Sequence, residues 1–156
     1  MKPVQLWLDE YAESHQNSIN IKIHWICVPL IMFSIIGLFA SIDLDIKFLS
    51  NFADYSHFGL VLILFASIYY FILSKPLFLG MLPISLLMVY FVELLSNLSI
   101  PLWISSLIIF VISWAGQFYG HKIEGKKPSF LKDIQFLMIG PLWLLSKLYK
   151  KFGIRY

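Results

Sequence analysis

Long apolar stretches alternate with polar connections through most of this 156-residue chain. Four of the stretches are close to the roughly 20 residues that a helix needs to cross the hydrocarbon core of a membrane. They cover about residues 24–41, 57–73, 77–95 and 100–118. Short connections make consecutive helices antiparallel neighbours. The pattern therefore predicts an all-α integral membrane protein in which four crossing helices form an up-down bundle.

A short amphipathic helix is predicted ahead of the first apolar stretch, over residues 3–16. Aromatic side chains, Tyr11 and His15 among them, recur there at intervals of four residues and so share one helix face. A polar turn follows, in which Asn20 is placed to cap the start of the next helix. We therefore expect His15 to close the first helix and His24 to lie in the first turns of the second.

The C-terminal segment, about residues 132–150, is predicted to be an interfacial or re-entrant helix. Its apolar part has about 15 residues, which is too short for a fifth crossing, and it is interrupted at Gly140–Pro141. Basic residues gather near its end, as in a helix that lies against anionic lipid: Lys147, Lys150, Lys151 and Arg155. The whole chain, residues 1–156, is expected to form a single membrane domain.

The composition and the placement of charge support a membrane protein with a defined orientation. Hydrophobic residues make up 59% of the chain and charged residues 13%, whereas soluble domains average about 25% charged residues. Four crossings place eleven of the twelve Lys and Arg residues on the side of the two termini, and only Lys47 on the other. Because basic loops stay in the cytoplasm, both termini are predicted to be cytoplasmic, in a bacterial inner membrane or a eukaryotic endoplasmic reticulum membrane. The modest net charge of +3 gives no reason to expect a nucleic-acid partner.

This topology sorts the four histidines of the chain by the side of the membrane. His15 and His24 lie at the start of the first crossing and His121 follows the last, so all three lie on the cytoplasmic side. His57 begins the second crossing on the opposite side, roughly 30 Å away across the hydrocarbon core. Three histidines can therefore meet, and imidazoles with a carboxylate suit Fe(II), Zn or Mn. The alternative is that each is a surface histidine bound to lipid headgroups or backbone.

A polar stripe marks the end of the last crossing. Gln117, His121 and Glu124 fall at positions i, i+4 and i+7 and so share one helix face. Gly116 and Gly120 form a G-x-x-x-G motif, which lets a neighbouring helix approach closely. The stripe thus places a carboxylate beside a histidine, and such sets with open coordination positions are typical of non-haem iron oxygenases.

Two segments, WLDEYAESHQNSINIKIHWICVPL and WAGQFYGHKIEGKKPSFL, resemble the fungal 2-hydroxy fatty acid dioxygenases and their bacterial relatives. The matching positions are Tyr11, His15, Asn20, Ile23, His24, Pro29, Trp114, Gln117, Phe118, Gly120, His121, Glu124 and Pro128. The middle of the chain matches only in its hydrophobicity.

The resemblance implies an Fe(II)-dependent dioxygenase of fatty-acid α-oxidation in the membrane. Such an enzyme takes a long-chain 2-hydroxy fatty acid and O2, and yields the acid one carbon shorter and CO2. The iron-binding histidines of the family correspond to His15, His24 and His121. Together with Glu124 they make the predicted catalytic set. Candidates for residues that support the ligands are Tyr11, Asn20, Gln117 and Glu124. We expect Glu124 to accept a hydrogen bond from an imidazole rather than to bind the metal.

Two other classes of protein remain open. One is a non-enzymatic haem- or metal-binding membrane protein, because paired histidines in helical bundles can serve as axial haem ligands. The other is a small transporter or scaffold, against which the crossings show no mid-membrane polar site and no pair of interrupted helices. The clustered histidine motifs of membrane lipid hydroxylases and desaturases are absent from the sequence.

Overall fold

The computed structural model describes residues 3–43, 57–127 and 135–156, and these ranges contain six helices and no β-strand beyond an isolated bridge. The helices are α1 (Val4–Ala12), α2 (Ser18–Ala40), α3 (Phe58–Leu73), α4 (Lys75–Ser96), α5 (Leu102–Glu124) and α6 (Gln135–Lys151). The prediction of an all-α fold is confirmed. The long connection after α2 and the first residues of the predicted 132–150 segment lie outside the described residues.

Three of the helices, α2, α4 and α5, are long and apolar enough to cross a membrane. The fourth predicted crossing is α3, which has 16 residues. At 1.5 Å per residue it measures about 24 Å, which is less than the roughly 30 Å of the hydrocarbon core. α2 begins at Ser18 and α5 ends at Glu124, so both are longer than predicted. Their added turns place His24 and His121 on regular helix.

α2 starts earlier than predicted because Asn17, and not Asn20, caps it. The Asn17 side chain accepts hydrogen bonds from the backbone N–H groups of Ile19 and Asn20 at 2.9 and 3.4 Å, which is the usual N-cap arrangement. The prediction of an Asn20 cap is therefore wrong, and Asn20 lies buried in the first turn of α2. α1 ends at Ala12, so the predicted helix over 3–16 is too long, and His15 lies in the turn between the two helices instead of closing the first.

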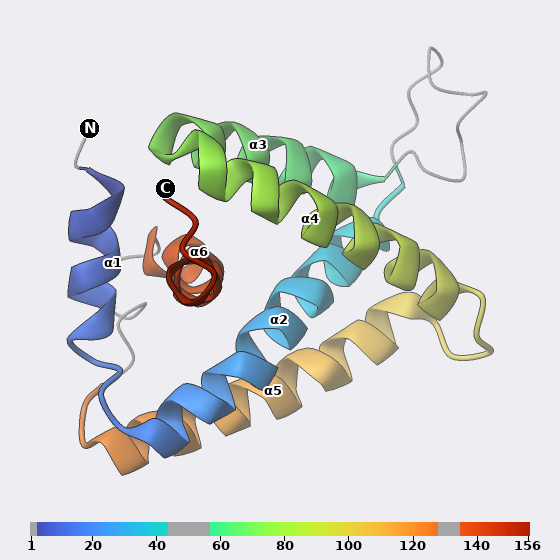
Figure 1. Ribbon diagram of the computed structural model, residues 1–156. Helices are drawn as coiled ribbons and strands as arrows, with labels where there is room; N and C mark the ends of the chain where they lie inside the picture. Colours follow the sequence, from blue (N-terminus) through green and yellow to red (C-terminus); the bar gives the residue numbers. More distant parts are fainter. Residues whose placement is uncertain (1–2, 44–56, 128–134) are drawn as a thin grey trace.

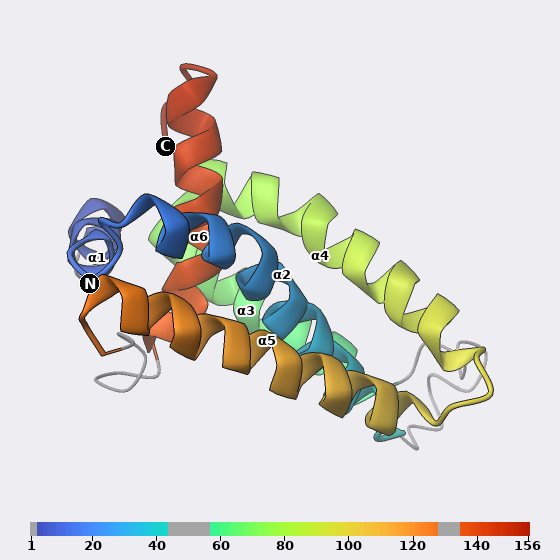
Figure 2. The ribbon, with the colours of Figure 1, turned by 90° about the horizontal axis from the view of Figure 1, so that it is seen from below.

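α2 and α5 lie side by side in both views of the ribbon (Figures 1 and 2). Glycines of α5 make this close approach possible. A Cβ atom added to Gly116 would lie 2.7 Å from the Sγ atom of Cys27, and one added to Gly120 would overlap the Oδ1 atom of Asn20. The prediction that the G-x-x-x-G motif receives a neighbouring helix is confirmed, and the neighbour is α2.

α6 is part of the hydrophobic core and lies between α1 and the paired helices α3 and α4 (Figure 1). It is continuous through Gly140 and Pro141, so the predicted interruption there is wrong. Its buried side chains include Phe136, Ile139, Leu142, Trp143, Leu144 and Leu145. They pack in one cluster with side chains of four other helices: Leu8 of α1, Val28 of α2, Tyr70 of α3 and Leu77 of α4. The place of α6 relative to the membrane stays a prediction.

Large apolar side chains cover the outer surfaces of the long helices. Those more than half exposed include Ile26, Leu64, Phe65, Leu79, Leu86, Val111, Ile112 and Phe118. Soluble monomers rarely expose so much contiguous apolar surface. Together with the three long apolar helices, this surface indicates a protein that associates with a membrane.

Candidate metal centre

Three buried histidines come together where the α1–α2 turn meets the end of α5. His15 lies in the turn, His24 in the second turn of α2 and His121 in the last turn of α5. Each offers one ligand nitrogen, and these atoms all lie within 4.8 Å of one another. The convergence expected from the topology is therefore present, and the three nitrogens form a group that could hold a metal ion.

His15 and His24 point their Nε2 atoms at each other across 2.8 Å. On the far side of each ring, Nδ1 lies against a backbone oxygen, that of Tyr11 at 2.6 Å for His15 and that of Asn20 at 2.9 Å for His24. A carbonyl oxygen only accepts hydrogen bonds, so Nδ1 carries the proton in each neutral ring and Nε2 presents a lone pair. Two lone pairs this close repel each other unless a proton or a metal cation binds them.

Burial keeps the His15 imidazole uncharged. Removal from water lowers its pKa from 6.5 to about 3, with a further contribution from the nearby His24, and these outweigh the opposing effect of the hydrogen bond to Tyr11. At neutral pH the ring is therefore in the neutral form, which is the form that binds metal ions. A cation other than a proton is thus the better partner for the facing nitrogens.

His121 supplies the third imidazole. Its ring centre lies 4.9 Å from that of His15 and 5.0 Å from that of His24, and it is steeply inclined to both. Its Nδ1 atom is buried and has no hydrogen-bond partner among the described residues. A buried nitrogen without a partner is costly, and a metal ion bound by the three rings would remove that cost.

The spacing of the His15 and His24 nitrogens fits a first-row transition metal. Two imidazole nitrogens on one ion, each about 2.0–2.1 Å from it, lie roughly 3 Å apart when coordination is right-angled, which is close to the 2.8 Å between His15 and His24. Imidazole suits Zn, Cu, Fe and Ni. Within the described ranges no carboxylate joins this cluster, so three histidines stand in place of the mixed set that the sequence stripe indicated.

Glu124 binds the turn that carries His15. Its carboxylate accepts hydrogen bonds from the backbone N–H groups of Gln16 and Asn17, at 2.8 and 2.9 Å, and from the side-chain amide of Asn20 at 2.9 Å. These donors differ from the imidazole that we expected as its partner. Because they flank the start of α2, Glu124 fixes the α1–α2 turn to the end of α5.

Asn20 connects this carboxylate to the histidine cluster. Its side chain donates to Glu124, and its backbone oxygen accepts from the Nδ1 of His24. Gly120 leaves the space that the Asn20 side chain occupies. Asn20 therefore contacts Glu124 of α5 through its side chain and the His24 ring through its backbone oxygen, and the second contact orients the ring.

Aromatic residues of α1 and α6 enclose His15, and the contribution of α6 was not foreseen from the sequence. The Tyr11 ring stacks on His15 with centres 4.1 Å apart and planes inclined by 7°. Trp143 of α6 lies 5.1 Å from the His15 ring and 5.3 Å from the Tyr11 ring. The residue in the sequence that could have indicated this contact is Gly140, because a Cβ atom there would lie 2.9 Å from the Tyr11 hydroxyl group.

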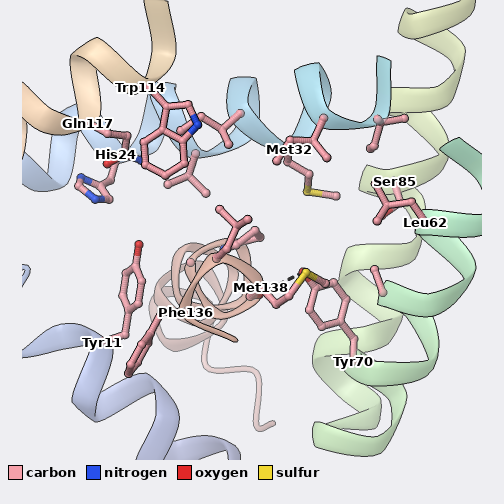
Figure 3. A pocket seen from close by; sticks show the side chains of 18 of the residues that line it. Tyr11, His24, Met32, Leu62, Tyr70, Ser85, Trp114, Gln117, Phe136 and Met138 are labelled. Carbon is pink, nitrogen blue, oxygen red and sulfur yellow. Dashed lines mark hydrogen bonds between the residues drawn. The ribbon is translucent and has the colours of Figure 1, made fainter. Parts of the chain in front are cut away.

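An apolar cavity of about 140 Å³ continues from the histidines toward α3 and α4. Figure 3 shows Tyr11, His24, Trp114 and Gln117 at one end and Leu62, Tyr70 and Ser85 at the other. Side chains between the two ends include Val28, Ile31, Met32, Phe136 and Met138. The lining on α2 runs from His24 to Ile36, roughly 18 Å along the helix at 1.5 Å per residue. The space is therefore long and mainly apolar, with imidazole and amide groups at the histidine end and the hydroxyl groups of Tyr70 and Ser85 at the other.

His57 lies apart from the other histidines, immediately before α3. It is buried and forms an isolated bridge with Asp43, just beyond the C-terminal end of α2. Most of the length of α2 thus separates it from His24. The three-histidine cluster does not include it, in agreement with its predicted place at the other end of the crossings.

Comparison with known protein families relates nearly the whole chain to a described group. The family described as 2-hydroxy-palmitic acid dioxygenase Mpo1-like matches residues 1–152. Comparison with curated proteins and with solved structures found no match. The matched range includes the three clustered histidines and the residues that line the cavity.

Proposed function

The chain belongs to the 2-hydroxy-palmitic acid dioxygenase Mpo1-like family, and from this membership we propose that it is an Fe(II)-dependent dioxygenase of fatty-acid α-oxidation. It takes a long-chain 2-hydroxy fatty acid and O2 and gives the fatty acid one carbon shorter, CO2 and water. One observation carries the proposal: three buried imidazoles that could hold a metal ion lie at one end of a long apolar cavity.

The iron is held by His15, His24 and His121 in this proposal. When bound, Fe(II) supplies an open coordination site at which O2 is activated. The protein keeps the imidazoles in the binding tautomer, because the backbone oxygens of Tyr11 and Asn20 hold the Nδ1 protons of His15 and His24. Glu124 acts as a positioning residue that holds the turn.

The apolar cavity binds the acyl chain and sets the direction of the substrate. Burial of each methylene group contributes about 0.8 kcal/mol, so a long chain is bound mainly by its tail. The carboxylate and the 2-hydroxyl group then lie at the histidine end, beside the imidazoles and the amide of Gln117. The apolar lining also excludes water from the reacting end of the acid.

We place the protein within a membrane, with both termini in the cytoplasm and with membrane lipid as the source of the fatty acid. The exposed apolar surfaces of α4 and α5 support the place in a membrane, and the uneven distribution of basic residues supports the orientation. The histidine cluster then lies near the cytoplasmic surface, and the tail of the substrate extends into the depth of the membrane.

A haem protein is the alternative that the same histidines raise. Axial haem ligands bind from opposite faces of the macrocycle. The 2.8 Å between the Nε2 atoms of His15 and His24 leaves no space for a porphyrin between them. Iron bound by the imidazoles without a porphyrin is therefore the better supported centre.

The test is reconstitution of the detergent-purified protein with Fe(II), followed by incubation with 2-hydroxyhexadecanoic acid and O2. We expect pentadecanoic acid, detected by mass spectrometry, with one O2 consumed per molecule formed. His57→Ala is the matched control and should give the same product. A folded, iron-loaded protein that consumes no O2 with this acid, or a Soret band in the purified protein, would contradict the proposal.

A further inference from the structure

Gln117 presents a buried hydrogen-bond acceptor to the cavity. The residue is 4% exposed, and its Oε1 atom has no hydrogen-bond partner among the described residues. Buried amide oxygens are nearly always paired, because an unpaired one loses its bonds to water without replacement. Such an atom at the wall of a ligand cavity is suited to a donor that arrives with the ligand.

Its position places this acceptor beside the metal-binding cluster. Gln117 lies one helical turn before His121 on α5 and lines the cavity together with His24. Figure 3 shows it at the same end as His24 and the hydroxyl group of Tyr11, and remote from Leu62 and Ser85. A group bonded to Gln117 therefore belongs to the polar head of the bound acid and not to its tail.

The chemistry of the head group decides which atom the amide oxygen can bind. An ionised carboxylate is only an acceptor, and it would repel another acceptor oxygen. A hydroxyl group carries one donor, and in a 2-hydroxy fatty acid it is attached to the carbon next to the carboxylate. It is the one group of that acid which can donate to Oε1.

We propose, on the basis of the function argued above, that Gln117 accepts a hydrogen bond from the 2-hydroxyl group and thereby selects 2-hydroxy fatty acids over unsubstituted ones. An unsubstituted acid leaves the buried oxygen unpaired, and a site built for a substrate hydroxyl group rejects the analogue that lacks it for this reason. The energy of one such bond predicts a preference of roughly tenfold in affinity.

The experiment measures binding, so that it does not depend on turnover. The full-length iron-loaded protein in detergent is kept free of O2, and hexadecanoic and 2-hydroxyhexadecanoic acids compete with a fluorescent fatty acid. We expect the wild-type protein to prefer the 2-hydroxy acid. Methionine has a similar size and no amide oxygen. In Gln117→Met the ratio of the affinity for 2-hydroxyhexadecanoic acid to that for hexadecanoic acid should therefore fall by about tenfold, while hexadecanoic acid binds as before.

Ser113→Ala is the matched control, because Ser113 is a buried polar residue one turn earlier on α5 and does not line the cavity. Its preference should equal that of the wild type. 2-Fluorohexadecanoic acid provides a measurement on the wild-type protein alone: it carries no donor at this carbon and should bind no better than hexadecanoic acid.

Three results overturn the inference while the proposed function stands. They are an unchanged preference in Gln117→Met, an equal loss of both acids in that variant, and tight binding of the fluoro acid. A wild-type protein that binds neither hexadecanoic nor 2-hydroxyhexadecanoic acid overturns the proposed function, and the role of Gln117 with it.

Discussion

The side-chain amide of Asn20 donates a hydrogen bond to the carboxylate of Glu124 at 2.9 Å, and this contact joins the first turn of α2 to the last residue of α5. The two residues are 104 positions apart in the chain. Both also contact the segment that carries a histidine: Glu124 through the turn, and Asn20 through the Nδ1 of His24. The arrangement of the histidines thus depends on a residue that lies outside the cluster itself.

Glu124→Gln should retain metal at reduced affinity. The glutamine keeps one acceptor oxygen for the three donors that the carboxylate binds, so the turn stays in place less firmly. Groups that orient metal ligands typically affect affinity by about 10–100-fold, and we expect the lower end for this variant and the upper end for Glu124→Ala. Metal content after dialysis measures it, with Glu93→Gln on α4 as control. A folded but metal-free Glu124→Gln would mean that Glu124 is itself a ligand.

The four histidines should not be equivalent. Single alanine substitutions at His15, His24 and His121 should each abolish O2-dependent turnover and lower the bound iron, because each removes one of three nitrogen donors. His57→Ala should leave both nearly intact, since His57 lies at the other end of α2. Iron analysis and turnover on the same preparations decide the matter. Equal damage from His57→Ala in a folded protein would contradict this sorting.

The sequence predicted the elements whose signal is local. Long apolar runs predict the helices that correspond to crossings. Because successive helices run in opposite directions, His24 and His121 are predicted at one end of the protein, where the structure has them. The G-x-x-x-G motif indicated a close helix contact, because the absence of a side chain is visible in the sequence. The sequence does not separate Asn17 from Asn20 as the cap of α2, because both are good capping residues and they lie only three positions apart.

The parts that the sequence did not predict depend on tertiary contacts. α6 has the length and the Gly-Pro pair of an interrupted surface segment, yet Pro29 and Pro83 also lie inside helices here, and Pro141 does the same. The burial of α6 comes from side chains of four other helices, which its own sequence does not specify. The partners of Glu124 are likewise mostly backbone N–H groups, which leave no trace in the side-chain pattern.

The α2–α5 contact predicts a rescue between two substitutions. Gly116→Ala should destabilise the protein by about 1–3 kcal/mol through overpacking, because the new Cβ atom would meet the Sγ atom of Cys27 at 2.7 Å. Cys27→Ala removes that atom, so the double variant should recover most of the loss. Thermal unfolding in detergent of both single variants and the double variant gives the coupling. Additive effects would show that the two residues do not interact.

The predicted orientation can be tested with single cysteines in a Cys27→Ala background. Ser99→Cys, in the α4–α5 connection, should react with a membrane-impermeant maleimide added to intact cells, whereas Lys127→Cys, after α5, should react only once the membrane is opened. The reason is the excess of basic residues on the side of the termini. The Cys27→Ala parent protein serves as the unlabelled control. Labelling in the reverse order would place the histidine cluster at the outer surface.

The far end of the cavity should set the length of the acyl chain. Ser85 on α4 is buried and lines the cavity at the end opposite His24 (Figure 3). Ser85→Phe fills that end with a larger side chain, which excludes the terminal carbons of a long acid from the cavity and leaves the histidines unchanged. Each methylene group that loses burial costs about 0.8 kcal/mol, so exclusion of two lowers kcat/KM by roughly tenfold.

Turnover of 2-hydroxy acids from dodecanoic to octadecanoic measures this effect. We expect Ser85→Phe to move the optimum to shorter acids and to leave bound iron unchanged. Leu86→Phe is the matched control, because Leu86 is the residue next to Ser85, is 58% exposed on the outer surface of α4 and cannot reach the cavity. The shift in Ser85→Phe should therefore be absent from Leu86→Phe. An unchanged length profile in a folded, iron-loaded Ser85→Phe would mean that the acyl chain does not occupy this cavity, and the tail would then have to lie along the lipid-facing surface of the helices.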